Sequence, residues 1–353
     1  MDFRFEKAET LKEKPTGALG FGKKFTDYMF VMDWKEGKGW HDQRIVPYAP
    51  MTIDPAAMVL HYAQETFEGL KAYRGKNGEV YLFRPDMNAK RFAKSNERMC
   101  MPEVPEEMFI DAIKELVKVE EEWIPNGEGE SLYIRPFMYA NEVALGVDQA
   151  DNYRFMIVLS PVGAYYPEGV NPIKIYVEDE LTRATIGGTG FVKCGGNYAG
   201  SLAGQMKAKK LGYTQVLWLD GVHRKYVEEV GSMNVMFLID GVVVTAPIKG
   251  TVLPGVTRNS ILELVKDWGY KVEERHLDIE ELMKAGREGK LQEAWGTGTA
   301  AVISPIGELF YKGEKVEVNG FKTGDLTQKL YDTLTGIQWG DLEDNHNWRV
   351  VIK

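Results

Sequence analysis

Three dipeptides that favour tight turns place the strongest constraint on the fold of this 353-residue chain: Asn77-Gly78, Asp220-Gly221 and Asp240-Gly241. Asn-Gly and Asp-Gly tolerate left-handed backbone at both central turn positions, and this geometry joins adjacent antiparallel strands. A run rich in β-branched and aromatic residues, 80–83, follows the first dipeptide. The strands predicted for the other two hairpins are 213–219 with 222–228 and 234–239 with 242–245. We therefore expect antiparallel sheets in both halves of the chain.

Helices are predicted beside these strands in each half. Asp86 has the residue type of an N-cap for a helix that reaches Met99, and Pro105 opens another that ends before Pro125. The further helices predicted are 256–268, which Gly269 ends, 278–285 and 325–334, and the further strands are 132–138, 154–159 and 173–177. Strands grouped apart from helices in both halves predict the α+β class rather than one long βαβ array.

The length of the chain predicts two domains at roughly 150 residues each. The run Tyr-Pro-Glu-Gly-Val-Asn at 166–171, followed by Pro172, has the composition of turns and favours a linker. We expect one domain over residues 1–166, a linker over 167–180 and a second domain over 181–353.

Composition excludes several classes of protein. Lysine and arginine number 43 against 52 aspartates and glutamates, so the net charge is −9. This acidic excess argues against binding nucleic acid or an anionic membrane, and no apolar run approaches the roughly 18 residues of a membrane span. Two cysteines, Cys100 and Cys194, cannot build a disulfide framework, so we expect a cytoplasmic protein. The five scattered histidines give no metal-ligand spacing, and we expect no metal.

Lys193 is the single charged residue in the 23 residues from 184 to 206. Small and apolar neighbours disfavour the ammonium form of a lysine. The neutral amine attacks carbonyl groups and can form a Schiff base. From these residues alone the alternative stays open that Lys193 extends to solvent from a flexible glycine loop.

Three features are suited to binding a phosphate group. Gly255-Val256-Thr257 lies where the helix of 256–268 should begin, and the free N–H groups of a helix start attract anions. Gly296-Thr297-Gly298-Thr299 offers further backbone N–H groups and hydroxyls, and Arg91 could clamp a phosphate. A tight turn, an ordinary loop and a surface salt bridge are the respective alternatives.

Nucleotide-binding motifs do not account for these features. Gly190 and Gly195 have the G-x-x-x-x-G spacing, but Gly196-Asn197 follows where a phosphate-binding loop needs Lys-Ser/Thr. A Schiff-base lysine with a phosphate site suggests pyridoxal 5'-phosphate, which also needs a partner for its pyridine nitrogen. Glu229 could be that partner, although a solvated acidic pair at a strand end is the alternative.

Several motifs, in order from about residue 34 to 348, resemble the branched-chain amino acid aminotransferases, which are fold-type IV pyridoxal phosphate enzymes. The motifs in the first half of the chain are His61 to Tyr73 (HYAQETFEGLKAY) and Ser131 to Pro136 (SLYIRP). Those in the second half are Lys193 to Ala199 (KCGGNYA), Glu229 to Asn234 (EVGSMN), Leu253 to Arg258 (LPGVTR) and Gly296 to Ala300 (GTGTA). The resemblance implies a smaller N-terminal α/β domain and a larger C-terminal pseudo-barrel domain.

The resemblance also implies which residues hold the cofactor. Lys193 would bind pyridoxal 5'-phosphate as a Schiff base and shuttle the proton. Tyr198 would hydrogen-bond the cofactor O3′, and Glu229 its pyridine nitrogen. The phosphate would be held by Arg91, by the backbone at Val256 and Thr257, and by Thr299.

Substrate contacts follow from the same resemblance. Tyr62 with Thr299 and Ala300 would grip the substrate carboxylate, and Arg135 would help to position the carboxylate of 2-oxoglutarate or glutamate. The side-chain pocket would be lined by Tyr62, Phe67, Tyr133, Tyr165 and Ser232. Leu145 and Val147 would reach the pocket of a partner subunit, which implies a homodimer.

The activity implied is reversible transfer of the amino group of L-leucine, L-isoleucine or L-valine to 2-oxoglutarate. Two alternatives share the fold type: a D-amino acid aminotransferase and an aminodeoxychorismate-lyase-like enzyme. A protein that binds a phosphorylated metabolite without a Schiff base is a third alternative. Mammalian members carry a Cys-x-x-Cys pair where this chain has 301–304 (AVIS), so no redox switch is expected there.

Overall fold

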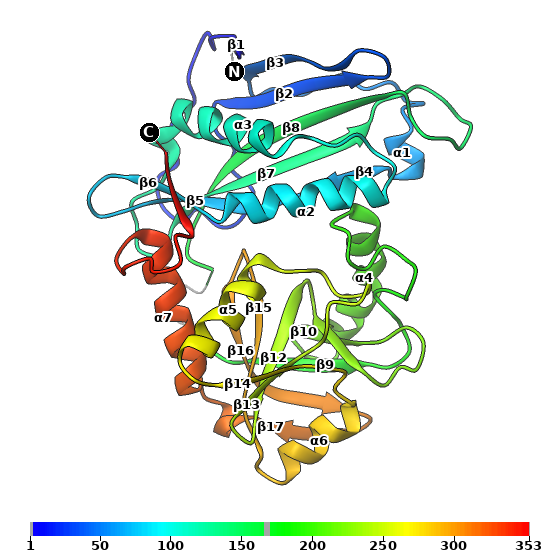
Figure 1. Ribbon diagram of the computed structural model, residues 1–353, viewed down its shortest axis with the longest axis vertical. Coiled ribbons are helices and arrows are strands. Elements are labelled where there is room, and N and C mark those ends of the chain that lie inside the picture. Colours follow the sequence, from blue (N-terminus) through cyan, green and yellow to red (C-terminus); the bar gives the residue numbers. More distant parts are fainter. Residues whose placement is uncertain (1–2, 166–169, 353) are drawn as a thin grey trace. The chain divides into compact units, whose positions relative to one another are not determined.

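The computed structural model describes residues 3–165 and 170–352, which form two compact units (Figure 1). The first unit contains residues 3–165, Val192–Gly195 and 336–352, and the second contains 170–191 and 196–335. Part of the linker expected over 167–180 lies outside the described residues. The division into 1–166, 167–180 and 181–353 therefore stays a prediction.

The first unit is built on a nine-stranded, mainly antiparallel sheet. Its order is β1-β3-β2-β8-β7-β5-β6-β18, and β4 pairs with β7. The strands are β1 (Arg4–Phe5), β2 (Tyr28–Lys35), β3 (Gly39–Pro47), β4 (Glu65–Phe67), β5 (Leu70–Arg74), β6 (Val80–Phe83), β7 (Ser131–Ala140), β8 (Asn152–Val162) and β18 (Arg349–Ile352). The hairpin predicted around Asn77-Gly78 is confirmed, because Arg74 pairs with Val80 and Gly78 has a φ of 84°.

Helices α2 (Pro85–Arg98) and α3 (Glu106–Val119) run along one face of this sheet (Figure 1). Their apolar sides meet in the core, where the ring of Phe92 lies 5.4 Å from that of Phe109 and 5.6 Å from that of Phe155 on β8. The short elements α1 (Val59–Tyr62) and a 3-10 turn (Glu121–Trp123) complete the unit. Burial of this aromatic cluster fixes α2, which carries Arg91, on the sheet.

The N-cap predicted for α2 is wrong. Arg84, in left-handed backbone (φ 49°, ψ 48°), precedes the helix, and Pro85 takes its first position. Proline suits that position because it has no N–H group to satisfy. Asp86 therefore lies inside the first turn, where its charge still complements the helix dipole. The start predicted at Pro105 for α3 is confirmed.

The second unit is built around a closed barrel of six strands. They run in the order β11-β10-β9-β16-β15-β12, and β11 pairs with β12 to close the ring. β13 and β14 extend the sheet beyond β12, and β17 pairs with β16. The strands are β9 (Ile173–Glu178), β10 (Gln215–Leu219), β11 (Val227–Val230), β12 (Met233–Ile239), β13 (Val242–Thr245), β14 (Lys271–Glu274), β15 (Leu291–Gly298), β16 (Val302–Tyr311) and β17 (Glu314–Glu317). The predicted α+β class is confirmed.

The two Asp-Gly turns of this unit differ. Ile239 pairs with Val242 across Asp240-Gly241, whose φ angles are 47° and 77°, so this tight hairpin is confirmed. The antiparallel pairing predicted across Asp220-Gly221 is confirmed, since Leu217 of β10 pairs with Val230 of β11. The tight turn is wrong, because a longer loop joins these two strands. The carboxylate of Asp220 stabilises that loop by accepting four backbone N–H groups, those of Val222, His223, Lys225 and Tyr226.

Three helices of the second half are as predicted, and one was not foreseen. α5 (Val256–Asp267), α6 (Ile279–Arg287) and α7 (Asp325–Trp339) confirm the predictions, although α7 extends beyond residue 334. The unforeseen helix α4 (Gly195–Lys210) begins in a glycine-rich stretch. Gly204 is required within it, because a Cβ at this position would collide with the ring of Trp218.

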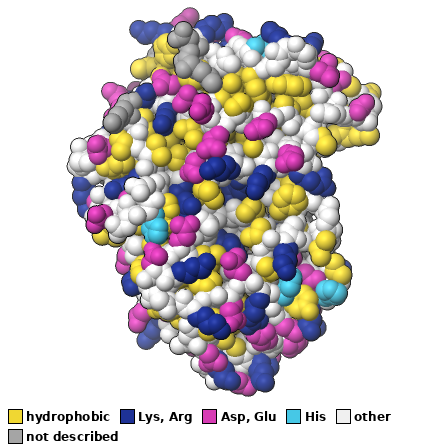
Figure 2. Space-filling view, viewed as in Figure 1, with side chains coloured by type: hydrophobic (Ala, Val, Ile, Leu, Met, Phe, Trp, Pro, Cys, Tyr) yellow, Lys and Arg dark blue, Asp and Glu magenta, His cyan; other side chains and the backbone are white. Residues whose placement is uncertain are grey.

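Acidic and basic side chains are interspersed over the face shown in Figure 2. Among the described residues, no helix is long and apolar enough to cross a membrane.

Candidate active site

The backbone of Lys193 is held from both sides within the first unit. Its N–H group donates to Ser95 Oγ of α2 at 3.2 Å, and its carbonyl accepts the N–H of Phe67 of β4 at 2.9 Å. The Lys193 Nζ atom lies 4.8 Å from the centre of the Phe67 ring. Helix α2 and strand β4 of the first unit therefore fix the backbone from which this side chain extends.

Glu65 holds the chain just after Lys193. Its carboxylate accepts the N–H of Gly195, the first residue of α4. A Cβ at Gly195 would collide with that carboxylate, so the contact requires glycine. Burial raises the pKa of Glu65, while the Gly195 N–H and the charge of Arg135 oppose the rise.

Arg91 lies in a buried ion pair with Glu68, which lies between β4 and β5. Arg91 Nε and Nη2 are each 2.7 Å from a different carboxylate oxygen of Glu68. Asn88 Nδ2 donates to the same carboxylate at 2.8 Å. Burial alone would raise the pKa of Glu68, but Arg91, Lys193 and Asn88 together lower it. Analysis of the sequence did not single out Glu68.

Phe67, Tyr133 and Arg135 lie together, as a shared binding role would require. Arg135 Nη2 donates to the Tyr133 hydroxyl at 2.8 Å, and its guanidinium lies over the rings of Phe67 (4.8 Å) and Tyr133 (5.2 Å). Tyr133 and Arg135 alternate on β7, so both face the same side of the sheet. Gly69 makes room for this cluster, because a Cβ there would collide with the Tyr133 hydroxyl.

The other predicted substrate residues of the first unit are exposed. Tyr62 ends α1, and its hydroxyl donates to the carbonyl of Leu145 at 2.6 Å. Leu145 and Val147 are 76% and 77% exposed. Tyr165, also exposed, follows β8 near the end of the described stretch.

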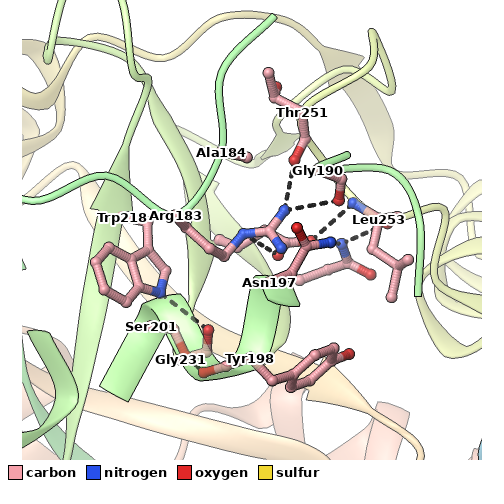
Figure 3. A network of polar contacts seen from close by, with 12 residues as sticks. Arg183, Ala184, Gly190, Asn197, Tyr198, Ser201, Trp218, Gly231, Thr251 and Leu253 are labelled. Atoms are coloured by element: carbon pink, nitrogen blue, oxygen red, sulfur yellow. Dashed lines mark hydrogen bonds and ion pairs between the residues drawn. The ribbon is translucent and has the colours of Figure 1, made fainter. Parts of the chain in front are cut away.

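Glu229 belongs to a polar network in the second unit, and Figure 3 shows Arg183, Thr251 and Leu253 of this network. Its Oε2 atom is 2.8 Å from Arg183 Nε, and the two side chains are 4% and 8% exposed. Its Oε1 atom accepts the Asn234 side-chain amide at 3.0 Å and the N–H of Leu253 at 2.9 Å. The solvated acidic pair considered as an alternative for Glu228-Glu229 is therefore wrong, because Glu229 is buried and paired.

Arg183 was not identified from the sequence, although it bridges three parts of this network. Besides the ion pair with Glu229, its Nη2 atom donates to the carbonyls of Gly190, at 3.0 Å, and Thr251 (Figure 3). The neighbouring Glu228 is buried as well. Burial raises the pKa of Glu228 to about 7, while Thr251 and Arg183 oppose the rise.

The loop that precedes Lys193 is tied to the first turn of α4. Asn197 Nδ2 donates to the carbonyl of Thr189 at 2.7 Å, and the Thr189 hydroxyl donates to Asn197 Oδ1 at 2.8 Å. Ser201 Oγ donates to the carbonyl of Tyr198 at 2.7 Å. These bonds fix the turn of helix that carries Tyr198 (Figure 3).

The start of α5 has the features of an anion site. Gly255 is extended (φ −67°, ψ 133°), no side chain caps the helix, and Val256 and Thr257 are its first residues. The same Asn234 amide that contacts Glu229 donates to the carbonyl of Leu253 at 2.9 Å. A Cβ at Gly255 would collide with Asn234 Oδ1, so this close approach requires glycine.

The remaining predicted residues lie at strand ends of the barrel. Thr299 and Ala300 form the turn between β15 and β16, and Ser232 is exposed between β11 and β12. The structure thus groups Lys193, Phe67, Tyr133 and Arg135 in the first unit, with Arg91 close to Lys193 through Glu68. In the second unit it groups Glu229 with the loop that leads to α5. Among the described residues, no cluster of three or more His, Cys, Asp or Glu side chains could hold a metal ion.

These donor groups fit pyridoxal 5'-phosphate. The buried, paired carboxylate of Glu229 suits a protonated pyridine nitrogen, and the uncapped start of α5 suits a phosphate. Lys193 supplies an amine on a fixed backbone.

Comparisons with known proteins point in the same direction. The family model for amino-transferase class IV matches residues 65–309. A probable branched-chain-amino-acid aminotransferase of Staphylococcus epidermidis is 57% identical over 99% of this chain and 98% of its own length. The branched-chain-amino-acid aminotransferase 2 of Bacillus subtilis is 52% identical over 99% and 96%.

Solved structures give the same result. The Escherichia coli branched-chain amino acid aminotransferase matches with a TM-score of 0.77 and 25% identity, over 93% of this chain and 99% of that one. The T.th. branched-chain amino acid aminotransferase, solved with pyridoxamine 5'-phosphate, matches with a TM-score of 0.76 and 26% identity, over 91% and 98%.

Proposed function

The chain belongs to the class IV aminotransferase family, and on this premise we propose that it is a branched-chain amino acid aminotransferase. It carries the amino group of L-leucine, L-isoleucine or L-valine to 2-oxoglutarate, with pyridoxal 5'-phosphate as cofactor. The observation that carries this proposal is the amine of Lys193 on a fixed backbone, supported by relatives of that name more than 50% identical over nearly the whole chain.

When bound, pyridoxal 5'-phosphate supplies an aldehyde that condenses with amines and a ring that accepts the electrons of a Cα carbanion. Lys193 would hold the cofactor through Nζ, and the same nitrogen, once released, would take up the substrate Cα proton and return it. Its backbone is fixed by Ser95 and Phe67, so the side chain extends from a constant point.

The other cofactor contacts are proposed residue by residue. Glu229, kept anionic by Arg183, binds the pyridine nitrogen and holds the proton there. Tyr198 hydrogen-bonds the O3′ atom. The phosphate is bound by Arg91, by the N–H groups of Val256 and Thr257, and by Thr299.

Phe67, Tyr62, Tyr133, Tyr165 and Ser232 are proposed to receive the substrate side chain. Burial of a leucine-sized group stabilises binding by roughly 1.5–3 kcal/mol, and an apolar surface distinguishes one methylene only modestly. All three branched-chain amino acids should therefore be accepted. Arg135, held by Tyr133, binds the carboxylate of 2-oxoglutarate or glutamate, and Tyr62, Thr299 and Ala300 bind the substrate carboxylate.

We propose further that the protein works as a homodimer in the cytoplasm. The exposure of Leu145 and Val147, next to the carbonyl that Tyr62 contacts, supports a role for this loop at a partner subunit. Sedimentation of the purified protein tests this: a single monomeric species at micromolar concentration would contradict it.

The visible absorption spectrum of the purified protein tests the activity. We expect a yellow band that bleaches on addition of L-leucine without any acceptor and does not bleach with D-alanine. Bleaching by D-alanine alone would assign the chain to D-amino acid chemistry. A protein that stays colourless after addition of pyridoxal 5'-phosphate would overturn the proposal.

A further inference from the structure

Glu68 is a completely buried carboxylate for which the proposed reaction has no direct use. It is 0% exposed, and Arg91 beside it is 7% exposed. Arg91 Nε, Arg91 Nη2, Asn88 Nδ2 and the N–H of Gly69 all point to its two oxygens, at 2.7, 2.7, 2.8 and 3.2 Å. Its own N–H donates to the carbonyl of Pro136 at 2.7 Å, so its backbone is also fixed.

This contact determines how Arg91 is presented. A guanidinium is planar and carries five N–H donors in a rigid arrangement. Glu68 accepts one hydrogen bond from Nε and one from Nη2 along the same edge of the guanidinium. These two bonds prevent rotation of the guanidinium plane, and its other three N–H groups point away from Glu68. Asn88, one helical turn before Arg91 on α2, holds the same carboxylate in place.

Nearby groups keep Glu68 ionised. Burial by itself would raise the pKa of Glu68, but Arg91, Lys193 and Asn88 lower it. The carboxylate therefore keeps the negative charge with which it holds Arg91.

We propose that Glu68 is a positioning residue that orients Arg91 toward the cofactor phosphate. The inference rests on the proposed function and deepens it. A purely structural ion pair would contribute to stability alone. The two roles therefore differ in what a change at Glu68 does to phosphate recognition.

Three variants separate these effects. Glu68→Gln keeps the shape of the side chain and removes its charge, whereas Glu68→Asp keeps the charge and shortens the arm that reaches Arg91. Glu120→Gln is the matched control, because Glu120 is a buried carboxylate of the same unit that accepts the N–H of Tyr28 and whose charge partners are Asp27 and Lys12.

The affinity of each apoprotein is measured for pyridoxal 5'-phosphate and for pyridoxal, which lacks the phosphate. For Glu68→Gln we expect the preference for the phosphorylated ligand to fall about tenfold or more, because Arg91 loses its orientation. Glu68→Asp should lose part of this preference, and Glu120→Gln should keep all of it.

A Glu68→Gln protein with wild-type ligand preference overturns the inference. Thermal unfolding of the apoprotein shows whether Glu68→Gln folds. If it does not fold, Glu68→Asp is the test of the inference, and an unchanged ligand preference in Glu68→Asp overturns the inference as well. A wild-type protein that forms no band overturns the proposed function, which distinguishes that failure from a failure of the inference alone.

Discussion

The guanidinium of Arg183 lies against the carboxylate of Glu229, with Nε 2.8 Å from Oε2 and both side chains buried. The pair lies beside the close approach of Asn234 to Gly255, through which the same network reaches the start of α5. A single set of contacts thus holds two groups proposed to bind different parts of one cofactor, its pyridine nitrogen and its phosphate. Changes in this set should affect stability and cofactor binding together.

Removing Arg183 should destabilise the apoprotein strongly. Arg183→Met leaves the buried carboxylate of Glu229 without its cation, which costs about 3–5 kcal/mol. The double variant Arg183→Met with Glu229→Gln removes both charges and should recover much of that loss. Urea unfolding of the apoproteins measures this, and a double variant no more stable than Arg183→Met would contradict the ion pair.

Lys193→Ala should abolish transamination, because both the amine and its proton transfer are lost. We expect a loss of at least about a thousandfold in kcat. Borohydride should attach the cofactor to the wild-type protein and not to the variant. Lys225→Ala, at an exposed lysine paired with Asp278, is the control and should behave as wild type. Near-normal turnover by Lys193→Ala would refute the assignment.

Gly69→Ala should impair binding of the dicarboxylic substrate. The added Cβ meets the Tyr133 hydroxyl, so Tyr133 must leave the position from which it contacts Arg135. We expect KM for 2-oxoglutarate to rise several-fold, because the displaced contact costs about 1 kcal/mol of binding free energy. Gly200→Ala, at a glycine with nothing within 4 Å, is the control. Unchanged KM in Gly69→Ala would show that the cluster tolerates the displacement.

Glu228 should make stability depend on pH in a defined window. Burial raises its pKa from 4.5 to about 7, so the folded protein holds a proton that the unfolded chain releases. Its contribution to stability therefore falls as the pH rises from about 4.5 to about 7 and is constant above that range. Glu228→Gln should remove this contribution and gain roughly 1–3 kcal/mol relative to wild type at pH 8. If the free energies of unfolding of the wild type and the variant differ by a constant amount from about pH 4 to 8, Glu228 makes no pH-dependent contribution to stability.

Local chemistry accounts for what the sequence predicts well. The hairpins at Asn77-Gly78 and Asp240-Gly241 and the start of α5 depend on residues next to each other in the chain. Helix α4 was missed because glycines and small polar residues at its start lack an apolar period. The turn at Asp220 was misjudged because one carboxylate stabilises a longer loop by accepting four backbone N–H groups.

In the proposed site, too, residues in distinctive local motifs were predicted, and residues whose role depends on distant contacts were not. The motifs marked Lys193, Glu229 and the loop at Gly255, since each has a distinctive local sequence. Glu68 and Arg183 escaped notice, because their importance lies in contacts with Arg91 and Glu229 that are distant in the chain. Such partners become visible only when folding brings distant segments together.

Strand β18, residues Arg349–Ile352, pairs with β6 of the first unit although the whole second unit separates them in sequence. During synthesis, the ribosome makes residues 80–83 early and their partner strand only after every element from β7 to α7. This edge of β6 therefore has no β18 to pair with while the second unit is being synthesised. Folding of the first unit therefore cannot finish before the whole second unit has been synthesised.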